Sequence, residues 1–256
     1  MQTTLNCKVV SKTVKLNELM KKNPIENKLE IKNEAEGTIE LFMYGTVGYS
    51  VYLNGIKYAL GDVVGNEINV HINSYGGDLF EGIAIKNFLL NRPEKINVYI
   101  DGIAASAASV IAMAGDRIVM PSDAQMMIHN PWTYTMGNAK ELRKTADDLD
   151  KAQTSLEKSY LNRFKGTEDE LKTLLDEETY LTADEAVLFG LADKIDGQAA
   201  DDDEPNAKAA LIKKFAAQAI PPATNTVETP EETDEEDNEE PESTFVNNLL
   251  KILEVN

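Results

Sequence analysis

The sequence predicts an α/β protein organised around a parallel sheet. Residues 68–73 alternate between apolar and polar side chains, and a glycine-rich turn and a helical pattern at 79–90 follow them. Residues 96–100 form a β-branched, apolar run, and a second turn and the alanine-rich stretch 104–114 come after it. Two consecutive strand–turn–helix units favour parallel strands joined by right-handed crossovers.

The other elements follow from periodicity and capping signals. Residues 38–45 indicate the first strand of the fold, and 47–60 form either a hairpin or a loop. Asn138 can cap a long helix, and Thr167 and Thr182 each begin a Thr-x-x-Glu pattern typical of a capping box. We therefore expect strands at 117–121, 124–128 and 191–195, and helices at 138–164, 168–175 and 182–189.

Charge and composition narrow the class of protein. The formal net charge of the 256 residues is -19, which argues against nucleic acid as a partner. The single cysteine, Cys7, excludes an internal disulfide and fits a reducing compartment. The first twenty residues lack the apolar core of a signal peptide, and no apolar run approaches the roughly 18 residues of a membrane span. We expect a soluble, intracellular protein that does not enter a membrane.

Shifts in composition divide the chain into three regions. Residues 1–37 are polar and lysine-rich and form an arm or an irregular first element, 38–197 hold the folded domain, and 198–256 form an acidic tail. Residues 201–256 contain 15 acidic and 4 basic residues, so -11 of the net charge lies there. Charge blocks of this kind are usually solvated and disordered. The tail is therefore expected to be largely disordered, with two short amphipathic segments at 208–219 and 245–253.

One serine lies where a nucleophile could be activated. Ser106 falls at the predicted start of the helix that follows the strand 96–100. Free backbone N–H groups and the positive end of the helix dipole at that position can stabilise an oxyanion. The alternative is that Ser106 and Ser109 are small residues that fill a tight helix contact.

Only two histidines are available as a general base. His129 ends a predicted strand, where active-site residues of parallel sheets tend to lie, although it could equally be a structural residue there. His71 lies in an alternating strand and could face the core or the solvent. A serine, a histidine and a carboxylate together support acyl transfer. Spacing alone leaves four candidates for the carboxylate: Asp176, Glu177, Glu178 and Asp193.

Metal and phosphate sites find little support in the sequence. There is no His-x-x-x-His pair and no acidic triplet in a plausible loop, and the acidic run 201–204 is expected to be solvated. The Gly76-Gly77 turn lacks the Gly-Lys-Ser/Thr ending of a phosphate loop. Its N–H groups could face a bound carbonyl, or it could simply join a strand to a helix. We expect no metal and no cofactor.

Four separated motifs resemble the Clp protease proteolytic subunit (ClpP) family, and they occur in its order over about residues 38–195. They are NSYGGD at 73–78, GIAAS at 102–106, MIHNP at 127–131, and YLTADEA at 180–186 with GLAD at 190–193. The details AASAAS and IHNPWTY look most similar to the ClpP-related head maturation (prohead) proteases of tailed bacteriophages.

The resemblance implies a serine endopeptidase on a ClpP/crotonase-like spiral of β-β-α units, with a projecting helical handle at about 132–164. Ser106 would be the nucleophile and His129 the general base. The family's acid lies five positions before the alanine of its Leu-Ser/Thr-Ala motif, which gives Glu178 here. The family usually has aspartate at that position, so Asp176 and Glu177 stay open as alternatives.

The resemblance also assigns the oxyanion donors. They would be the N–H groups of Gly77 and Ala107, with Gly76 completing the glycine turn. Tyr75 stands where the family usually has proline, which alters the stiffness of the turn more than its chemistry.

Partners and location follow from the same resemblance. It implies polypeptide substrates, capsid or scaffold proteins among them, and rings of seven subunits stacked in pairs, in the host cytoplasm or the prohead. Whether an unfoldase ATPase is needed stays open. Three rival hypotheses remain: a signal-peptide-peptidase-like Ser–Lys peptidase on the same fold, a crotonase-like acyl-CoA enzyme, and a catalytically inactive structural ring component of the prohead.

Overall fold

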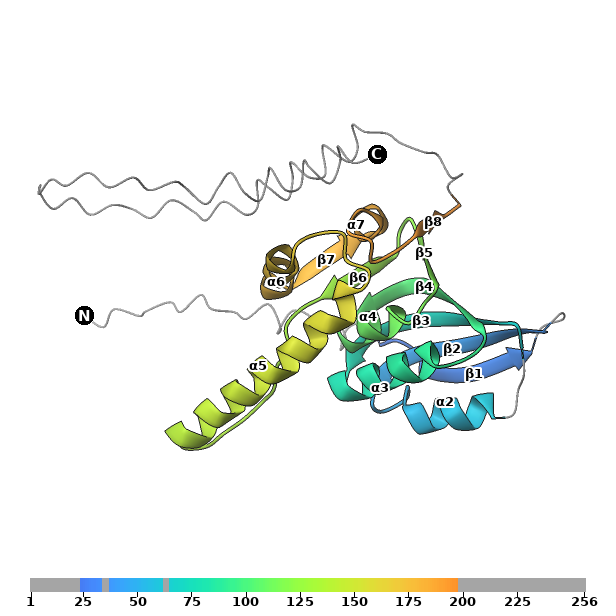
Figure 1. Ribbon diagram of the computed structural model, residues 1–256. Helices are drawn as coiled ribbons and strands as arrows, with labels where there is room; N and C mark the ends of the chain where they lie inside the picture. The colour runs from blue at the N-terminus through green and yellow to red at the C-terminus, as the bar shows by residue number, and fades with distance from the viewer. Residues whose placement is uncertain (1–23, 34–36, 62–64, 198–256) are drawn as a thin grey trace, which may run out of the picture. The chain divides into compact units, whose positions relative to one another are not determined.

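The computed structural model describes residues 24–33, 37–61 and 65–197 (Figure 1). The first part of the expected N-terminal arm and the whole acidic tail lie outside these residues. Within them the chain forms an eight-stranded sheet and six helices. The fold is thus mixed α/β, as the sequence predicts.

The sheet is parallel through its centre. Five strands pair in parallel in the order β2 (Thr38–Val47), β3 (Glu67–Gly77), β4 (Lys95–Ala105), β5 (Arg117–Pro121) and β8 (Lys194–Asp196). The strand β6 (Gln125–Ile128) pairs in parallel with the end of β4. Two further strands are antiparallel: β1 (Lys28–Asn33) runs along β2, and β7 (Thr179–Thr182) runs along β6. The carboxyl ends of β3, β4 and β6 therefore lie next to one another.

One face of the sheet carries the core. Side chains of β2 and β3 alternate strictly between buried and half-buried positions, which is the period of an extended strand. The helices α2 (Leu53–Leu60), α3 (Leu79–Leu90) and α4 (Ala107–Ala112) cover the buried face (Figure 1). The apolar side chains beneath them are almost fully buried, among them Ile39, Leu41, Met43, Ile68, Val70, Ile72, Val98 and Ile100.

The remaining helices follow the core strands in the chain. The long helix α5 (Ala139–Leu161) extends away from the sheet (Figure 1) and is largely exposed in its first half. The short helices α6 (Glu168–Asp176) and α7 (Ala183–Leu188) flank β7. The predicted capping boxes at Thr167 and Thr182 are confirmed, and so is the predicted cap at Asn138, which forms a capping box with Glu141.

Three expectations from the sequence need correction. The first strand is β1, so the expected arm over residues 1–37 in fact contributes residues 28–33 to the sheet. Residues 53–60, expected as a hairpin or a loop, form α2, whose first N–H, that of Leu53, donates to Glu81 Oε1 at 2.6 Å. The strand expected at 96–100 continues to Ala105, so the following helix begins at Ala107 rather than at Ala104.

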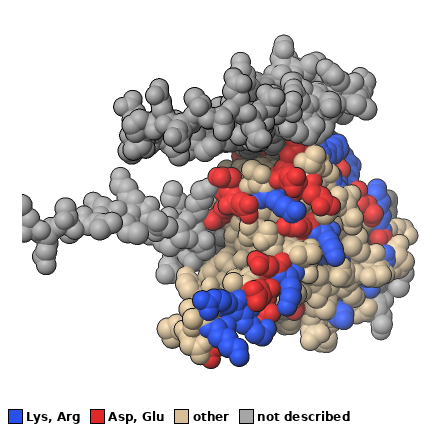
Figure 2. Space-filling model, turned by 60° about the vertical axis from the view of Figure 1, so that its left-hand side comes forward, with Lys and Arg blue, Asp and Glu red and all other residues tan. Residues whose placement is uncertain are grey.

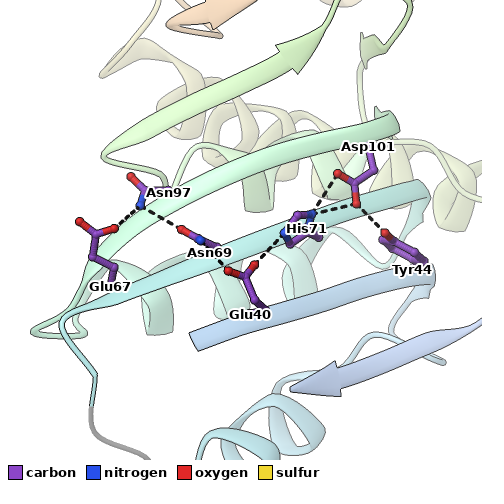
Figure 3. Close-up of polar contacts among 7 residues, drawn as sticks. All are labelled: Glu40, Tyr44, Glu67, Asn69, His71, Asn97 and Asp101. Atoms are coloured by element: carbon purple, nitrogen blue, oxygen red, sulfur yellow. Dashed lines mark hydrogen bonds and ion pairs between the residues drawn. The ribbon is translucent and has the colours of Figure 1, made fainter. Parts of the chain in front are cut away.

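The opposite face of the sheet is polar and half-buried, and it contains His71 (Figure 3). The imidazole stacks between Phe42 and Tyr99, with ring centroids 4.6 and 5.2 Å away. Its Nδ1 lies 3.0 Å from the Asp101 carboxylate, and its Nε2 lies 2.9 Å from Glu40 Oε2. Burial by itself lowers the pKa of His71, but the hydrogen bonds and charges of Asp101 and Glu40 outweigh burial and raise it. The side chain of His71 thus lies on the polar face of the sheet, opposite the core.

Candidate active site

Ser106 occupies a sharp strand-to-helix turn. It follows the last residue of β4 and is the N-cap of α4, with φ 54° and ψ -125°. The sequence placed it in the first turn of the helix, and the longer strand moves it to the turn itself. Its N–H donates to the carbonyl of Met127 at 2.9 Å, which ties the turn to β6. A serine with positive φ is strained, and strain of this kind concentrates at functional sites.

His129 lies beside this serine. It follows β6 directly and is only 6% exposed. Its Nε2 lies 2.8 Å from Ser106 Oγ, so the two residues that the sequence singled out are in hydrogen-bonding contact. Burial lowers the pKa of His129 to about 4. The ring is therefore neutral near pH 7, and Nε2 can accept a proton from the serine hydroxyl.

The candidate carboxylates differ in their surroundings. Asp193 pairs with Arg163 and accepts from the Ile118 N–H at 2.7 Å, so its carboxylate is engaged with these two groups. Asp176 accepts from Asn130 Nδ2 at 2.6 Å.

The position of Glu178 follows from the pairing of two strands. β6 and β7 pair antiparallel up to Ile128 opposite Thr179, and His129 and Glu178 are the residues directly beyond this last pair on the two sides. Glu178 also has φ 51°. Among the residues that the structure describes, Ser106 and Glu178 are the only two other than glycine with positive φ.

The glycine turn at the end of β3 packs against the serine. Gly76 has φ +95°, and a Cβ there would lie 2.7 Å from Ser106 Cβ and 2.9 Å from the Ala107 nitrogen. Gly77 has φ +147°, and a Cβ there would lie 2.1 Å from the Val47 carbonyl oxygen. Only glycine fits at either position without a shift of the backbone. The turn therefore needs both glycines for packing, whatever its further role.

The two glycines of the turn differ in what their N–H groups contact. The Gly76 N–H donates to Ser74 Oγ at 3.0 Å, and the Ser74 hydroxyl donates to the Gly45 carbonyl at 2.6 Å. Ser74 is buried and holds the turn in place. In the sequence this serine stands out only as part of the NSYGGD motif, because its partner Gly45 is 29 residues away.

A lysine base for Ser106 finds no support in the contacts of Lys86. This lysine of α3 is 9% exposed, and burial lowers its pKa. Its Nζ lies 3.0 Å from the hydroxyl of Ser159 on α5, whereas Ser106 contacts His129. The Ser–Lys rival is thus not favoured by this structure.

The charged surface, the metal-ligating groups and the helices of the described residues give three further observations. On the face shown in Figure 2, a group of basic side chains lies at the lower left with acidic side chains directly beside it, and acidic side chains predominate above. Within residues 24–33, 37–61 and 65–197, no three His, Cys, Asp or Glu side chains are placed to hold a metal ion. In the same part of the chain, every helix is too short or too polar to cross a membrane.

The fold and the site together define a class of protein. An α/β sheet whose strand ends bring a strained serine against a buried, neutral histidine has the arrangement that serine hydrolases use. Residues 60–199, more than half of the chain, match the family model of the Clp protease. The chain belongs to the Clp protease family. Its members are peptidases, typically of the serine type, that typically form oligomeric rings and act on polypeptide substrates.

Proposed function

We propose that this protein is a serine endopeptidase in which Ser106 is the nucleophile and His129 the general base. The observation that carries the proposal is the 2.8 Å contact between Ser106 Oγ and His129 Nε2, at a serine whose backbone is held at φ 54°. A positive φ is costly for a residue other than glycine, so its occurrence beside a buried, neutral imidazole supports a functional role for Ser106.

The reaction follows from the contacts. Ser106 Oγ attacks the carbonyl carbon of the scissile peptide bond while His129 Nε2 takes the hydroxyl proton. The imidazolium then gives that proton to the leaving amine, and the C–N bond breaks to leave an ester on Ser106. A water molecule, deprotonated by His129, hydrolyses the ester, and the proton returns to Ser106 Oγ. Atoms and charge balance without any cofactor.

The oxyanion of each tetrahedral intermediate needs two donors. We assign the N–H groups of Gly77 and Ala107 to this role. Ala107 follows the nucleophile directly, and Gly76 packs against the same turn. The Gly76 N–H already donates to Ser74 Oγ, which supports Gly77 as the donor of the pair. Donors fixed before the reaction stabilise the developing charge at little reorganisation cost.

The acid of the triad is assigned to Glu178. Its support is its place directly before Thr179, the partner of Ile128 in the β6–β7 pair, because His129 comes directly after Ile128. A carboxylate there would orient the imidazole and stabilise the imidazolium once it forms.

The test is covalent labelling. Wild type, Ser106→Ala and the control Ser155→Ala, which removes a serine hydroxyl from the exposed surface of α5, are treated with a fluorophosphonate and weighed by intact mass spectrometry. One adduct on wild type and on Ser155→Ala, and none on Ser106→Ala, is the expected result. Equal labelling of Ser106→Ala, or none of the wild type, would overturn the assignment.

The substrates we propose are capsid or scaffold proteins of a tailed bacteriophage prohead. The support is the similarity of AASAAS and IHNPWTY to the prohead form of the family. Co-expression with the head proteins of one phage should yield shortened products with wild type and none with Ser106→Ala. Analytical ultracentrifugation of both forms tests the expected seven-membered rings. Head proteins that are cleaved equally in the presence of wild type and of Ser106→Ala would contradict the assignment of these substrates.

A further inference from the structure

A pair of buried hydroxyl groups lies behind the nucleophile. Ser109 of α4 and Tyr160 of α5 are both fully buried, and their oxygens are 2.8 Å apart. Ser109 Oγ also lies 2.6 Å from the carbonyl oxygen of Ser106 and 3.1 Å from that of Met127. The reaction described above uses neither hydroxyl.

The direction of these hydrogen bonds follows from the number of protons. The carbonyl oxygen of Ser106 can only accept, so Ser109 donates its single proton to it at the shorter distance. Tyr160 must then donate to Ser109 Oγ. Burial raises the pKa of Tyr160, so the phenol keeps its proton under all ordinary conditions. The result is a chain in which the Tyr160 hydroxyl donates to Ser109, and Ser109 donates to the carbonyl of Ser106.

The chain ends on the peptide group that matters most to the reaction. The carbonyl of Ser106 and the N–H of Ala107 belong to one planar amide. A hydrogen bond to the oxygen of an amide increases the polarity of its N–H, and bonds in such a chain strengthen one another by about 10–30% each. The same bonds also fix the orientation of this amide, which follows a serine with φ 54°.

We propose that Tyr160 and Ser109 are positioning residues that hold and polarise the Ser106–Ala107 peptide, so that the Ala107 N–H stabilises the oxyanion. This inference rests on the function proposed above. Through the hydroxyl of Tyr160, the inner end of α5 would influence the rate of acylation. The residue does not touch the substrate or the reacting atoms.

The experiment compares three single variants and one double variant. Tyr160→Phe and Ser109→Ala each remove one hydroxyl from the chain. The control, Ser159→Ala, removes the neighbouring buried hydroxyl of α5, which contacts Lys86 instead of the nucleophile turn. The double variant Ser109→Ala/Tyr160→Phe removes the whole chain and leaves no buried phenol without a partner. For each protein we would measure kcat and KM for a fluorogenic peptide, the rate of fluorophosphonate labelling, and the melting temperature.

Stability and catalysis should respond differently. Tyr160→Phe and Ser109→Ala should each lower kcat and the labelling rate by about three- to tenfold, the range of a single hydrogen bond, with KM changed less than about twofold. The double variant should be as slow as Ser109→Ala, because one chain is broken in both. It should nevertheless melt at a higher temperature than Ser109→Ala, because the orphan phenol is gone. Ser159→Ala should label at the wild-type rate.

Two results would overturn the inference. If wild type is labelled at Ser106 but Tyr160→Phe and Ser109→Ala react as fast as wild type or as Ser159→Ala, the positioning role is wrong and the proposed function stands. If the losses in rate follow the melting temperatures across all four variants, the hydroxyls are only structural. A wild type that is not labelled at all would end both proposals.

Discussion

The pH dependence of stability should reveal how burial acts on His129. In the folded protein its pKa is about 4, whereas an unfolded chain has the ordinary value near 6.5. Between these values the unfolded chain binds a proton that the folded protein does not. The free energy of unfolding of the wild type therefore rises with pH across this window through His129. Replacing the residue by glutamine removes this contribution.

The magnitude follows from the shift. A pKa lowered from 6.5 to about 4, at about 1.4 kcal/mol for each unit, corresponds to about 3 kcal/mol. The side chain is almost fully buried, so solvent screening reduces this figure little. The contribution is fully present above about pH 6.5 and is lost as the pH falls to about 4. A change of this size is a large part of the stability of an ordinary domain.

Urea unfolding followed by far-UV circular dichroism measures it. Wild type and His129→Gln are unfolded at several pH values at one protein concentration, because association would change the apparent stability. Subtracting one free energy of unfolding from the other cancels the pH-dependent contributions of the carboxylates that both proteins share. The difference should rise by about 3 kcal/mol between about pH 4 and 6.5 and stay level above that. A difference that is flat or falls with pH would refute the reasoning and show that a carboxylate stabilises the imidazolium more than burial disfavours it.

Three further perturbations test other parts of the structure. For His71→Gln, the difference in free energy of unfolding between wild type and variant should fall with pH. Since the folded pKa of His71 is raised, its contribution to stability is present below about pH 6.5 and is lost as the pH rises. A difference that grows with pH would contradict this. Gly76→Ala should lower kcat/KM by at least about tenfold while circular dichroism still reports a folded protein, because its Cβ would lie 2.7 Å from Ser106 Cβ; wild-type hydrolysis would show that the turn can yield. Glu178→Gln should lower kcat by about a hundredfold and Asp176→Asn by less than about twofold in peptide hydrolysis, and the reverse order would make Asp176 the acid.

Local rules in the sequence were sufficient for some elements. Asn138, Thr167 and Thr182 cap their helices as predicted, because the cap and the acid three residues later satisfy each other's backbone within one turn. The strand β1 could have been found too. Its alternation places Lys28 and Lys32 over the Phe42 ring on the polar face, but the lysines resembled those of a solvated arm.

Contacts between distant residues determine the elements that sequence patterns do not predict. Asp101-Gly102 is typical of a strand break. In the structure, however, Asp101 accepts from Tyr44 and the Ile103 N–H donates to Asn73 Oδ1 at 3.3 Å, and β4 continues through both residues. The helix α2 has no side-chain cap in its own sequence and takes Glu81 as an acceptor instead. The hydrogen bond between Tyr160 and Ser109 joins residues 51 positions apart, so the helical pattern of residues 138–164 could not show what the tyrosine hydroxyl does.

Backbone strain gives an argument for the acid that does not depend on counting from a family motif. Glycine would adopt the positive φ of Ser106 and Glu178 without a steric cost, whereas each side chain costs about 1–3 kcal/mol there. Glu177, by contrast, has φ -75° and Asp176 ends α6, so ordinary helical geometry accommodates both. Glu178 directly follows the C-cap of α6, where a left-handed residue often ends a helix, so its positive φ also serves the turn into β7. Positive φ distinguishes Glu178 from its two neighbours, and the comparison of Glu178→Gln with Asp176→Asn tests whether Glu178 is the acid.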